Sequence, residues 1–324
     1  MIMEKISLGK GPSGEKKLKE EKKLKEGKKL KKEKRLKKEK KLKKGWEEVN
    51  RETPRPFLKW AGGKSQLLPQ ISSVLPDEFG TYFEPFLGAG ALLFYLQPTE
   101  AVVNDSSEEL MNVYRVVRDN LEELLEHLKG HVNQREYYYR IRSWDRDGDF
   151  YRQLNPVEKA SRIIYLNKTC YNGLFRVNKS GQFNTPFGSY RNPELVNEAL
   201  LRAVHRYFQL ARVELRCGDF ADCLEEAEPG DFAYLDPPYQ PLSSSANFTG
   251  YHRDGFNWKE QERLKEECDR LDSKGVKFLL SNSSTEDIAN LYRRYDCQVV
   301  SARRAINSKA AHRGAVEELL IKNY

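Results

Sequence analysis

The chain has 324 residues, 39% of them hydrophobic, and can therefore bury one sizeable core and a smaller second one. Its net charge of +8 is unevenly spread, because residues 1–45 carry 20 Lys/Arg against 7 Asp/Glu and residues 46–324 carry 36 against 41. The 5 cysteines form no C-x-x-C pair, and no apolar run has the length of a membrane span. We therefore expect a soluble, cytoplasmic protein with reduced thiols and no metal.

Residues 16–45 are tandem Lys-rich hexads in which leucine recurs at every sixth position. A step of six residues turns an α-helix by about 240°, so these leucines would lie on three sides of it. No apolar stripe forms, and the heptad of a coiled coil is absent. The pattern predicts that residues 1–50 are a basic, low-complexity and disordered arm. It is either a weak nucleic-acid-binding tail or an extension without function.

A packed domain begins near residue 56, with a Gly-Gly-Lys turn at 62–64 before a helical pattern over 65–71. This turn lacks the spacing of a nucleotide-triphosphate P-loop. A predicted strand over 81–84 leads to a turn with Gly88 and Gly90 and then to an apolar helix over 91–96. Strand, glycine turn and helix are typical of a Rossmann-like unit, although a plain tight turn is the alternative.

The next predicted strand, over 101–103, leads into Asn104-Asp105. An acidic residue at the end of this second strand holds ribose hydroxyls in such folds. Residues 131–193 are rich in Arg, Tyr and Asn, a composition that suits a nucleic-acid surface. The remaining pattern predicts helices over 110–128, 200–210 and 259–271, strands over 213–215, 232–235, 276–280, 298–300 and 317–321, and a loop over 243–256 long enough to be a lid.

The apolar strand over 232–235 ends at Asp236-Pro237-Pro238-Tyr239. Two prolines remove two backbone donors, so this segment presents carbonyl and carboxylate acceptors beside an aromatic ring that can stack on a planar substrate. Acceptance of both hydrogens of an aromatic amine by Asp236 and the Pro237 carbonyl would stabilise the charge that develops when the amine attacks. The alternative is a strand that ends in a structural Pro-Pro turn.

From about Arg55 onward, the chain resembles the Dam-type DNA adenine methyltransferases. The segments that resemble this family are, in the family's order, FLKWAGGK, FEPFLGAG, Asn104-Asp105, KTCYNGLFRVNKSGQFNTPFG, GDF and DPPYQPLSSSANFTGYH. The resemblance implies a Rossmann-like, mixed seven-stranded α/β sheet formed by residues 51–108 and 194–324. Residues 109–193 would form an inserted target-recognition domain with helices and a β-hairpin.

The resemblance also implies the cofactor, S-adenosylmethionine, and the target, the adenine of double-stranded GATC, flipped out of the duplex. The implied catalytic residues are Asp236, Pro237, Pro238 and Tyr239. Those implied at the cofactor are Trp60, Lys64, Phe86, Gly88, Gly90, Asp105, Asp219, Phe220 and Asp236. Those implied at the DNA are Lys59, Tyr171, Asn172, Leu174, Arg176, Pro186 and Tyr190. We expect the protein to be a monomer in solution.

Tetrapeptides related to Asp236-Pro237-Pro238-Tyr239 also occur in enzymes that methylate other amino groups. The alternative targets are therefore cytosine N4 in DNA, adenine in RNA and a protein glutamine. The predicted recognition insertion argues against a protein substrate, and the segment around Tyr171 argues against the other two. A DNA-binding relative without activity is a further alternative, although the tetrapeptide is intact. Host marking, partnership with a restriction enzyme and a phage function are all compatible with this sequence.

Overall fold

The computed structural model describes residues 53–239, 256–303 and 315–324. The basic arm over 1–50 lies outside these residues, as does the predicted lid loop over 243–256 except for Phe256. These described residues belong to one compact unit.

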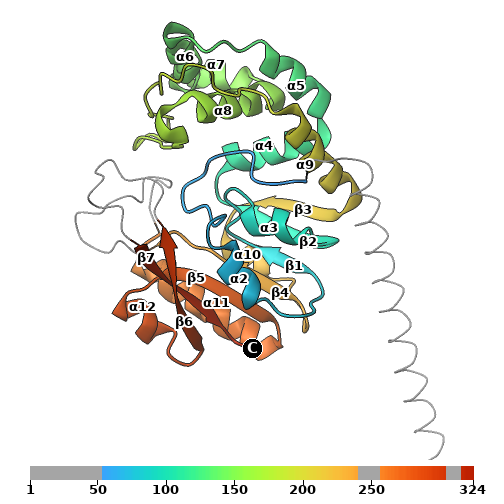
Figure 1. Cartoon of the computed structure of the whole chain (residues 1–324), viewed down its shortest axis with the longest axis vertical. Coiled ribbons are helices and arrows are strands. Elements are labelled where there is room, and N and C mark those ends of the chain that lie inside the picture. The colour runs from blue at the N-terminus through green and yellow to red at the C-terminus, as the bar shows by residue number, and fades with distance from the viewer. Residues whose placement is uncertain (1–52, 240–255, 304–314) are drawn as a thin grey trace, which may run out of the picture. The chain divides into compact units, whose positions relative to one another are not determined.

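A seven-stranded sheet with the order β3-β2-β1-β4-β5-β7-β6 forms the centre of this unit (Figure 1). The strands are β1 (Tyr82–Glu84), β2 (Glu100–Asp105), β3 (Arg212–Cys217), β4 (Phe232–Leu235), β5 (Lys277–Ser283), β6 (Asp296–Arg303) and β7 (Ala315–Lys322). Strands β1 to β5 pair in parallel, whereas β7 is antiparallel to both of its neighbours. The predicted mixed seven-stranded α/β sheet is confirmed.

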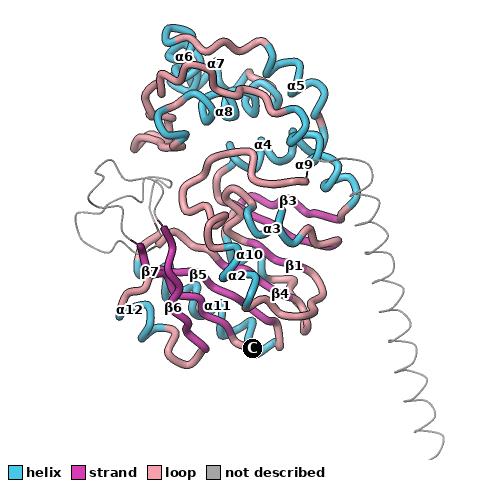
Figure 2. Tube along the Cα trace, viewed as in Figure 1, coloured by secondary structure: helices cyan, strands magenta, loops and turns pink. Residues whose placement is uncertain are grey.

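Helices flank the sheet and also form a group beyond its β3 edge (Figure 2). They are α2 (Leu68–Ser73), α3 (Ala91–Leu96), α4 (Glu108–Asp119), α5 (Leu121–Lys129), α6 (Arg135–Arg142), η1 (Ser143–Arg146), α7 (Gly148–Gln153), α8 (Pro156–Thr169), η2 (Tyr171–Gly173), α9 (Glu198–Leu210), α10 (Phe220–Leu224), α11 (Trp258–Lys274) and α12 (Glu286–Leu291). Within the described ranges, no helix has the length and apolar character needed to span a membrane.

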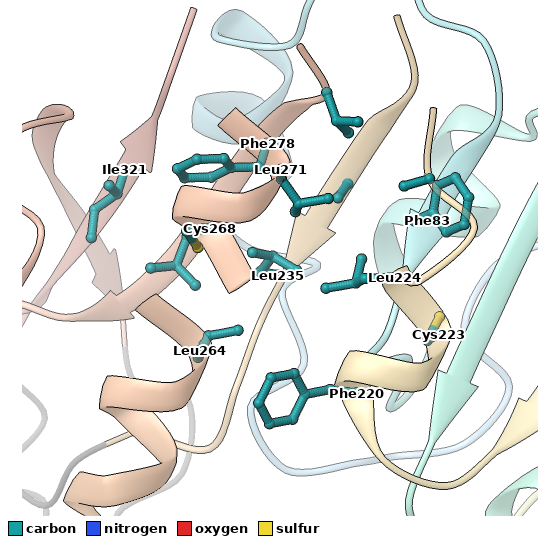
Figure 3. Packing of buried hydrophobic residues seen from close by; sticks show 14 of the residues in the cluster. Phe83, Phe220, Cys223, Leu224, Leu235, Leu264, Cys268, Leu271, Phe278 and Ile321 are labelled. Carbon is teal, nitrogen blue, oxygen red and sulfur yellow. The ribbon is translucent and has the colours of Figure 1, made fainter. Parts of the chain in front are cut away.

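One face of the sheet buries its apolar side chains against α10 and α11 (Figure 3). Leu264, Cys268 and Leu271 recur along α11 at helical spacing and are fully buried, opposite Leu235 of β4 and Phe278 of β5. Burial of one such side chain stabilises the fold by about 1.5–3 kcal/mol. This packing holds the end of β4, and hence the residues after it, against α11.

The predicted helix over 110–128 is two helices in the structure. Asn120 separates α4 from α5, with backbone angles of φ −131° and ψ 39° that no helix interior adopts. Asn competes with helical hydrogen bonding through its side chain and favours helix ends. The apolar periodicity continues on both sides of Asn120, so the hydrophobic pattern did not indicate the break.

Helix α4 connects the sheet to the group of helices that follows it. It packs against β3 on one side and α8 on the other, and Figure 1 shows α5 to α8 gathered beyond α4 and α9. Helix α8 begins with a capping box, in which Asn155 and Glu158 each accept a hydrogen bond from the other's backbone N–H. The limits of the inserted domain, 109–193, remain a prediction, because α4 contributes to both parts.

The strand order reverses between β1 and β4, since connections run outward from β1 on one side and from β4 on the other. In open parallel sheets, ligands bind at the carboxyl ends of the strands at such a reversal. The glycine turn after β1, Asp105 at the end of β2 and Asp236 after β4 all lie at this edge.

Candidate active site

The buried amide of Asn104 joins three segments at the carboxyl edge of the sheet. Its Nδ2 donates to the Pro85 carbonyl at 3.0 Å and to the Gly218 carbonyl at 3.1 Å. The end of β2 is therefore fixed to the loop after β1 and to the loop after β3. Asp105 and Asp219, two of the carboxylates implied at the cofactor, follow directly on two of these fixed segments.

The glycine turn after β1 orients Asp105. Gly88 has a φ of +49° and donates its N–H to Asp105 Oδ2 at 3.0 Å, while Ser107 N–H donates to Oδ1 at 2.9 Å. Gly90 has a φ of +67°, and a Cβ there would lie 3.0 Å from the Phe94 ring. The backbone conformation therefore favours glycine at both positions, and a Cβ at Gly90 would in addition press against the Phe94 ring. The structure brings Gly88, Gly90 and Asp105 together.

Lys64 and Asp236 form an ion pair, with 2.9 Å between Nζ and Oδ1. Lys64 is 5% exposed and also donates to the Gly62 carbonyl at 2.7 Å. Burial raises the pKa of Asp236 to about 6, although the Lys64 ammonium opposes this shift. Because Lys64 favours the ionised form, Asp236 is mostly a carboxylate at pH 7 and can accept hydrogen bonds.

Tyr239 lies in the same cluster. The Lys64 ammonium is 4.6 Å from the centre of the Tyr239 ring, and the Tyr239 hydroxyl donates to Glu318 Oε2 at 2.5 Å. Burial raises the pKa of Tyr239 well above its usual value, so its hydroxyl stays protonated and remains a donor. The ring is therefore fixed from two sides.

Glu318 was missed by the sequence analysis. It pairs with Ser283 in the antiparallel β5–β7 ladder, which brings the beginning of β7 to the carboxyl end of β5. Glu318 lies two residues before the buried Leu320 in a predicted strand, so the two side chains are on the same face of that strand. This spacing is the sequence signal by which Glu318 could have been found. Nothing in the local pattern indicated that this face meets Tyr239.

Trp60 lies between the glycine turn and the inserted segment. Its ring stacks on Phe175 with centroids 4.5 Å apart, and a Cβ on Gly88 would be 3.4 Å from its Cδ1 atom. Phe175, a second residue absent from the sequence-based site, is buried. Trp60 thus connects the predicted cofactor region with the predicted recognition hairpin.

Phe86 and Phe220 form a separate aromatic pair at the same edge, and Asp219 lies beside it. The Phe86 and Phe220 rings stack with centroids 5.3 Å apart, and the Arg263 guanidinium lies 4.4 Å from the Phe220 centroid. Asp219 caps α10 through the Ala221 N–H and pairs with Arg263. Arg263 belongs to α11, and its contact with Asp219 and Phe220 was not predicted.

The predicted recognition hairpin is present as two antiparallel bridges, Cys170 with Phe187 and Val177 with Phe183. The structure assigns no strand to this segment, which Figure 2 shows as loop after α8. The polar and glycine-rich sequence of the segment leaves few residues that favour a continuous ladder. The predicted hairpin is confirmed as a chain reversal, with these two bridges in place of continuous strands.

The residues implied at the DNA differ in exposure along this hairpin. Tyr171, Asn172, Arg176 and Pro186 are exposed, as is Lys59, whereas Leu174 and Tyr190 are half-buried. Arg176 Nε donates to Asn184 Oδ1 at 2.7 Å, which holds its guanidinium along the hairpin. Asn167 accepts from the Lys59 N–H at 2.9 Å and donates to the carbonyls of Lys59 and Gly173 at 2.7 and 3.1 Å. Lys59 is therefore fixed to the base of the hairpin.

No group of three or more His, Cys, Asp or Glu side chains in the described part of the chain is arranged to hold a metal ion. All 5 cysteines lie in that part and are free thiols.

A family model described as D12 class N6 adenine-specific DNA methyltransferase matches residues 60–306. The Type II methyltransferase M1.LlaDCHI of Lactococcus lactis subsp. cremoris is 43% identical over 279 residues, covering 86% of this chain and 98% of that protein. The Type II methyltransferase M.MjaIII of Methanocaldococcus jannaschii is 40% identical, covering 83% and 99%. The DNA adenine methylase of Escherichia coli (strain K12) is 34% identical, covering 82% and 94%.

Proposed function

The chain belongs to the D12 class N6 adenine-specific DNA methyltransferase family, and we propose that it methylates the flipped-out adenine of double-stranded GATC as a monomer. The observation that supports this most directly is the half-buried Asp236, which follows β4 at the strand-order reversal and shares one cluster with Lys64 and Tyr239. Residues 109–193 would supply target recognition. Digestion of the methylated DNA to deoxynucleosides, followed by mass spectrometry, tests the chemistry, since N6-methyl-2′-deoxyadenosine and N4-methyl-2′-deoxycytidine differ in mass.

Members of this family use S-adenosylmethionine, and the described residues fit that cofactor. Glycine adopts the positive φ angles at positions 88 and 90 without strain and lets a ligand approach the backbone closely, and Asp105 is already oriented there by two N–H groups. We assign Asp105 to the ribose hydroxyls and Asp219 and Phe220 to the adenine. Trp60, Lys64, Phe86 and Asp236 would complete the pocket. When bound, the cofactor supplies an electrophilic methyl group on a positively charged sulfur.

In this proposal Asp236 and the Pro237 carbonyl accept the two hydrogens of the adenine amine. This localises the nitrogen lone pair and stabilises the positive charge that develops on the nitrogen during attack. Lys64 favours the ionised form of the half-buried Asp236. The Tyr239 ring would stack on the flipped base, and its hydroxyl bond to Glu318 holds the ring in place.

Activity should depend on the ionisation of Asp236. With a pKa of about 6, the carboxylate is present above that pH and is lost as the pH falls through it. We therefore expect kcat/KM for DNA, which reports ionisations of the free enzyme, to fall on the acid side with an apparent pKa near 6. Values of kcat/KM measured from pH 5 to 8, with circular dichroism to show that the fold persists, check this. A kcat/KM that stays constant over that range would contradict the role of Asp236.

The hairpin supports the proposed target, because its residue types match those that read GATC in the Dam-type enzymes. Arg176 can make a bidentate pair with guanine O6 and N7, and Leu174 and Pro186 offer apolar contact to a thymine methyl. Tyr171 and Asn172 are exposed and can fill the space that a flipped adenine leaves. Tyr190 and Lys59 would complete the contact surface.

Arg176→Ala should reduce discrimination at one guanine by about 1–3 kcal/mol, because the bidentate contact is lost. Methylation rates on GATC duplexes and on duplexes with one altered base pair measure this. Lys179→Ala is the matched control, since Lys179 is also an exposed cation in the hairpin but has no proposed base contact. We expect both variants to keep their affinity for the cofactor. Unchanged discrimination in Arg176→Ala would exclude Arg176 from base recognition.

A further inference from the structure

Strand β5 changes from apolar to polar while remaining buried. Phe278, Leu279 and Leu280 are followed by Ser281, Asn282 and Ser283, and Asn282 is fully buried. A buried amide costs folding free energy unless it is hydrogen-bonded. The proposed reaction assigns no role to these residues, although they lie at the carboxyl edge that holds the candidate site.

The Asn282 side-chain amide begins a chain of two hydrogen bonds. This chain ends at the backbone of the catalytic tetrapeptide, Asp236-Pro237-Pro238-Tyr239. The Asn282 Oδ1 accepts the Ser283 N–H at 2.8 Å, which fixes the orientation of the amide, and its Nδ2 donates to Gln261 Oε1 at 2.9 Å. Gln261 is 1% exposed and lies on α11. Its own Nε2 donates to the Pro238 carbonyl at 3.3 Å. Two buried amides therefore connect β5 to Pro238.

The tetrapeptide needs such a contact because its backbone has few other means of attachment. The parallel pairing of β4 with β5 ends at Leu235 and Leu280, one residue before Asp236. Pro237 and Pro238 have no N–H to donate, and their rings fix φ but leave ψ free. A hydrogen bond to the Pro238 carbonyl restricts ψ at Pro238. It thereby sets the direction of the chain between Pro237 and Tyr239.

Lys64 contacts the tetrapeptide at Asp236 and Glu318 contacts it at Tyr239, so the Pro238 contact lies between these two. We infer that Gln261, oriented by Asn282, is a positioning residue that holds the Pro237 carbonyl and the Tyr239 ring in their reactive arrangement. This inference rests on the proposed function. Neither amide would touch the DNA or the cofactor.

The test is the single-turnover methylation rate of Gln261→Leu with saturating DNA and S-adenosylmethionine. Displacement of a reacting group by a fraction of an ångström to 1 Å commonly costs about 10- to 100-fold in rate. We expect a decrease of at least about 10-fold, with dissociation constants for DNA and cofactor within about 2-fold of wild type. Gln209→Leu is the matched control, because it removes another glutamine bond to a backbone carbonyl, 2.7 Å from Arg118 O, on the distant α9. That control should keep the wild-type rate.

Gln261→Glu provides a readout that simple packing would not change. A protonated glutamic acid can still donate to the Pro238 carbonyl and accept from Asn282, whereas the ionised form cannot donate. Relative to wild type, this variant should lose activity as the pH rises and regain it as the pH falls. The same variant keeps the inference testable if Gln261→Leu fails to fold.

A wild-type rate in folded Gln261→Leu, or a Gln261→Glu to wild-type ratio that does not vary with pH, would overturn the inference while leaving the proposed function intact. An equal loss in rate and in both binding constants would also overturn it, because that result indicates a general structural role. Absence of methyl transfer by the wild-type protein would overturn the proposed function, and this inference with it.

Discussion

Asp236→Ala should lower the rate of methyl transfer by about 100- to 1000-fold, which is the usual cost of removing one preorganised electrostatic partner of a transition state. This half-buried carboxylate is the proposed acceptor that stabilises the charge on the attacking amine. Its removal also leaves the Lys64 ammonium, 5% exposed, without its ion-pair partner at 2.9 Å. Single-turnover transfer of a tritiated methyl group measures the loss independently of DNA affinity.

Asp222→Ala is the control for this variant. Asp222 belongs to α10 in the same domain, but its side chain is exposed. We expect the control to transfer at the wild-type rate. If Asp236→Ala folds and retains a rate within about threefold of wild type, Asp236 is not the electrostatic partner proposed here.

Tyr239→Ala should be the next most severe change. Base stacking on an aromatic side chain contributes about 1–3 kcal/mol, so we expect a loss of about 5- to 150-fold. This loss should be smaller than that of Asp236→Ala, because stacking holds the base without stabilising the developing charge. Fluorescence of 2-aminopurine at the target adenine reports the fraction of flipped base directly.

Tyr239→Phe separates the ring from its hydroxyl. The variant keeps the stacking surface and loses only the 2.5 Å bond to Glu318, so we expect a milder decrease than in Tyr239→Ala. Glu318→Gln should resemble Tyr239→Phe, since it weakens the same bond from the other side. A greater loss in Tyr239→Phe than in Tyr239→Ala would show that the ring does not stack on the base.

Those parts of the site that follow a strand directly could be predicted from the sequence. Asp105 and Asp236 each end an apolar strand, and carboxyl ends of parallel strands meet at one edge, so local pattern was sufficient to bring them together. The glycine turn was predictable for the same reason, because Gly88 and Gly90 adopt positive φ angles that few other residues tolerate.

The contacts made across the sheet could not be predicted in this way. Glu318 reaches Tyr239 only because β7 pairs with β5 in one particular register, and Gln261 reaches Pro238 only because α11 packs on that face. Strand register and helix packing depend on residues far apart in the chain. The local sequence pattern of β7 or of α11 therefore does not predict either contact. The stacking of Trp60 on Phe175 has the same origin.

The most direct test uses plasmid DNA from a strain without adenine methylation, incubated with the protein and tritiated S-adenosylmethionine. The DNA is then digested with one endonuclease blocked by methylated GATC, one that requires it and one indifferent to it. We expect tritium in the DNA, protection from the first enzyme, cleavage by the second and unchanged cleavage by the third. Incorporated tritium in DNA that the first enzyme still cuts completely would contradict GATC as the target, and absence of incorporation would contradict the proposed methyl transfer itself.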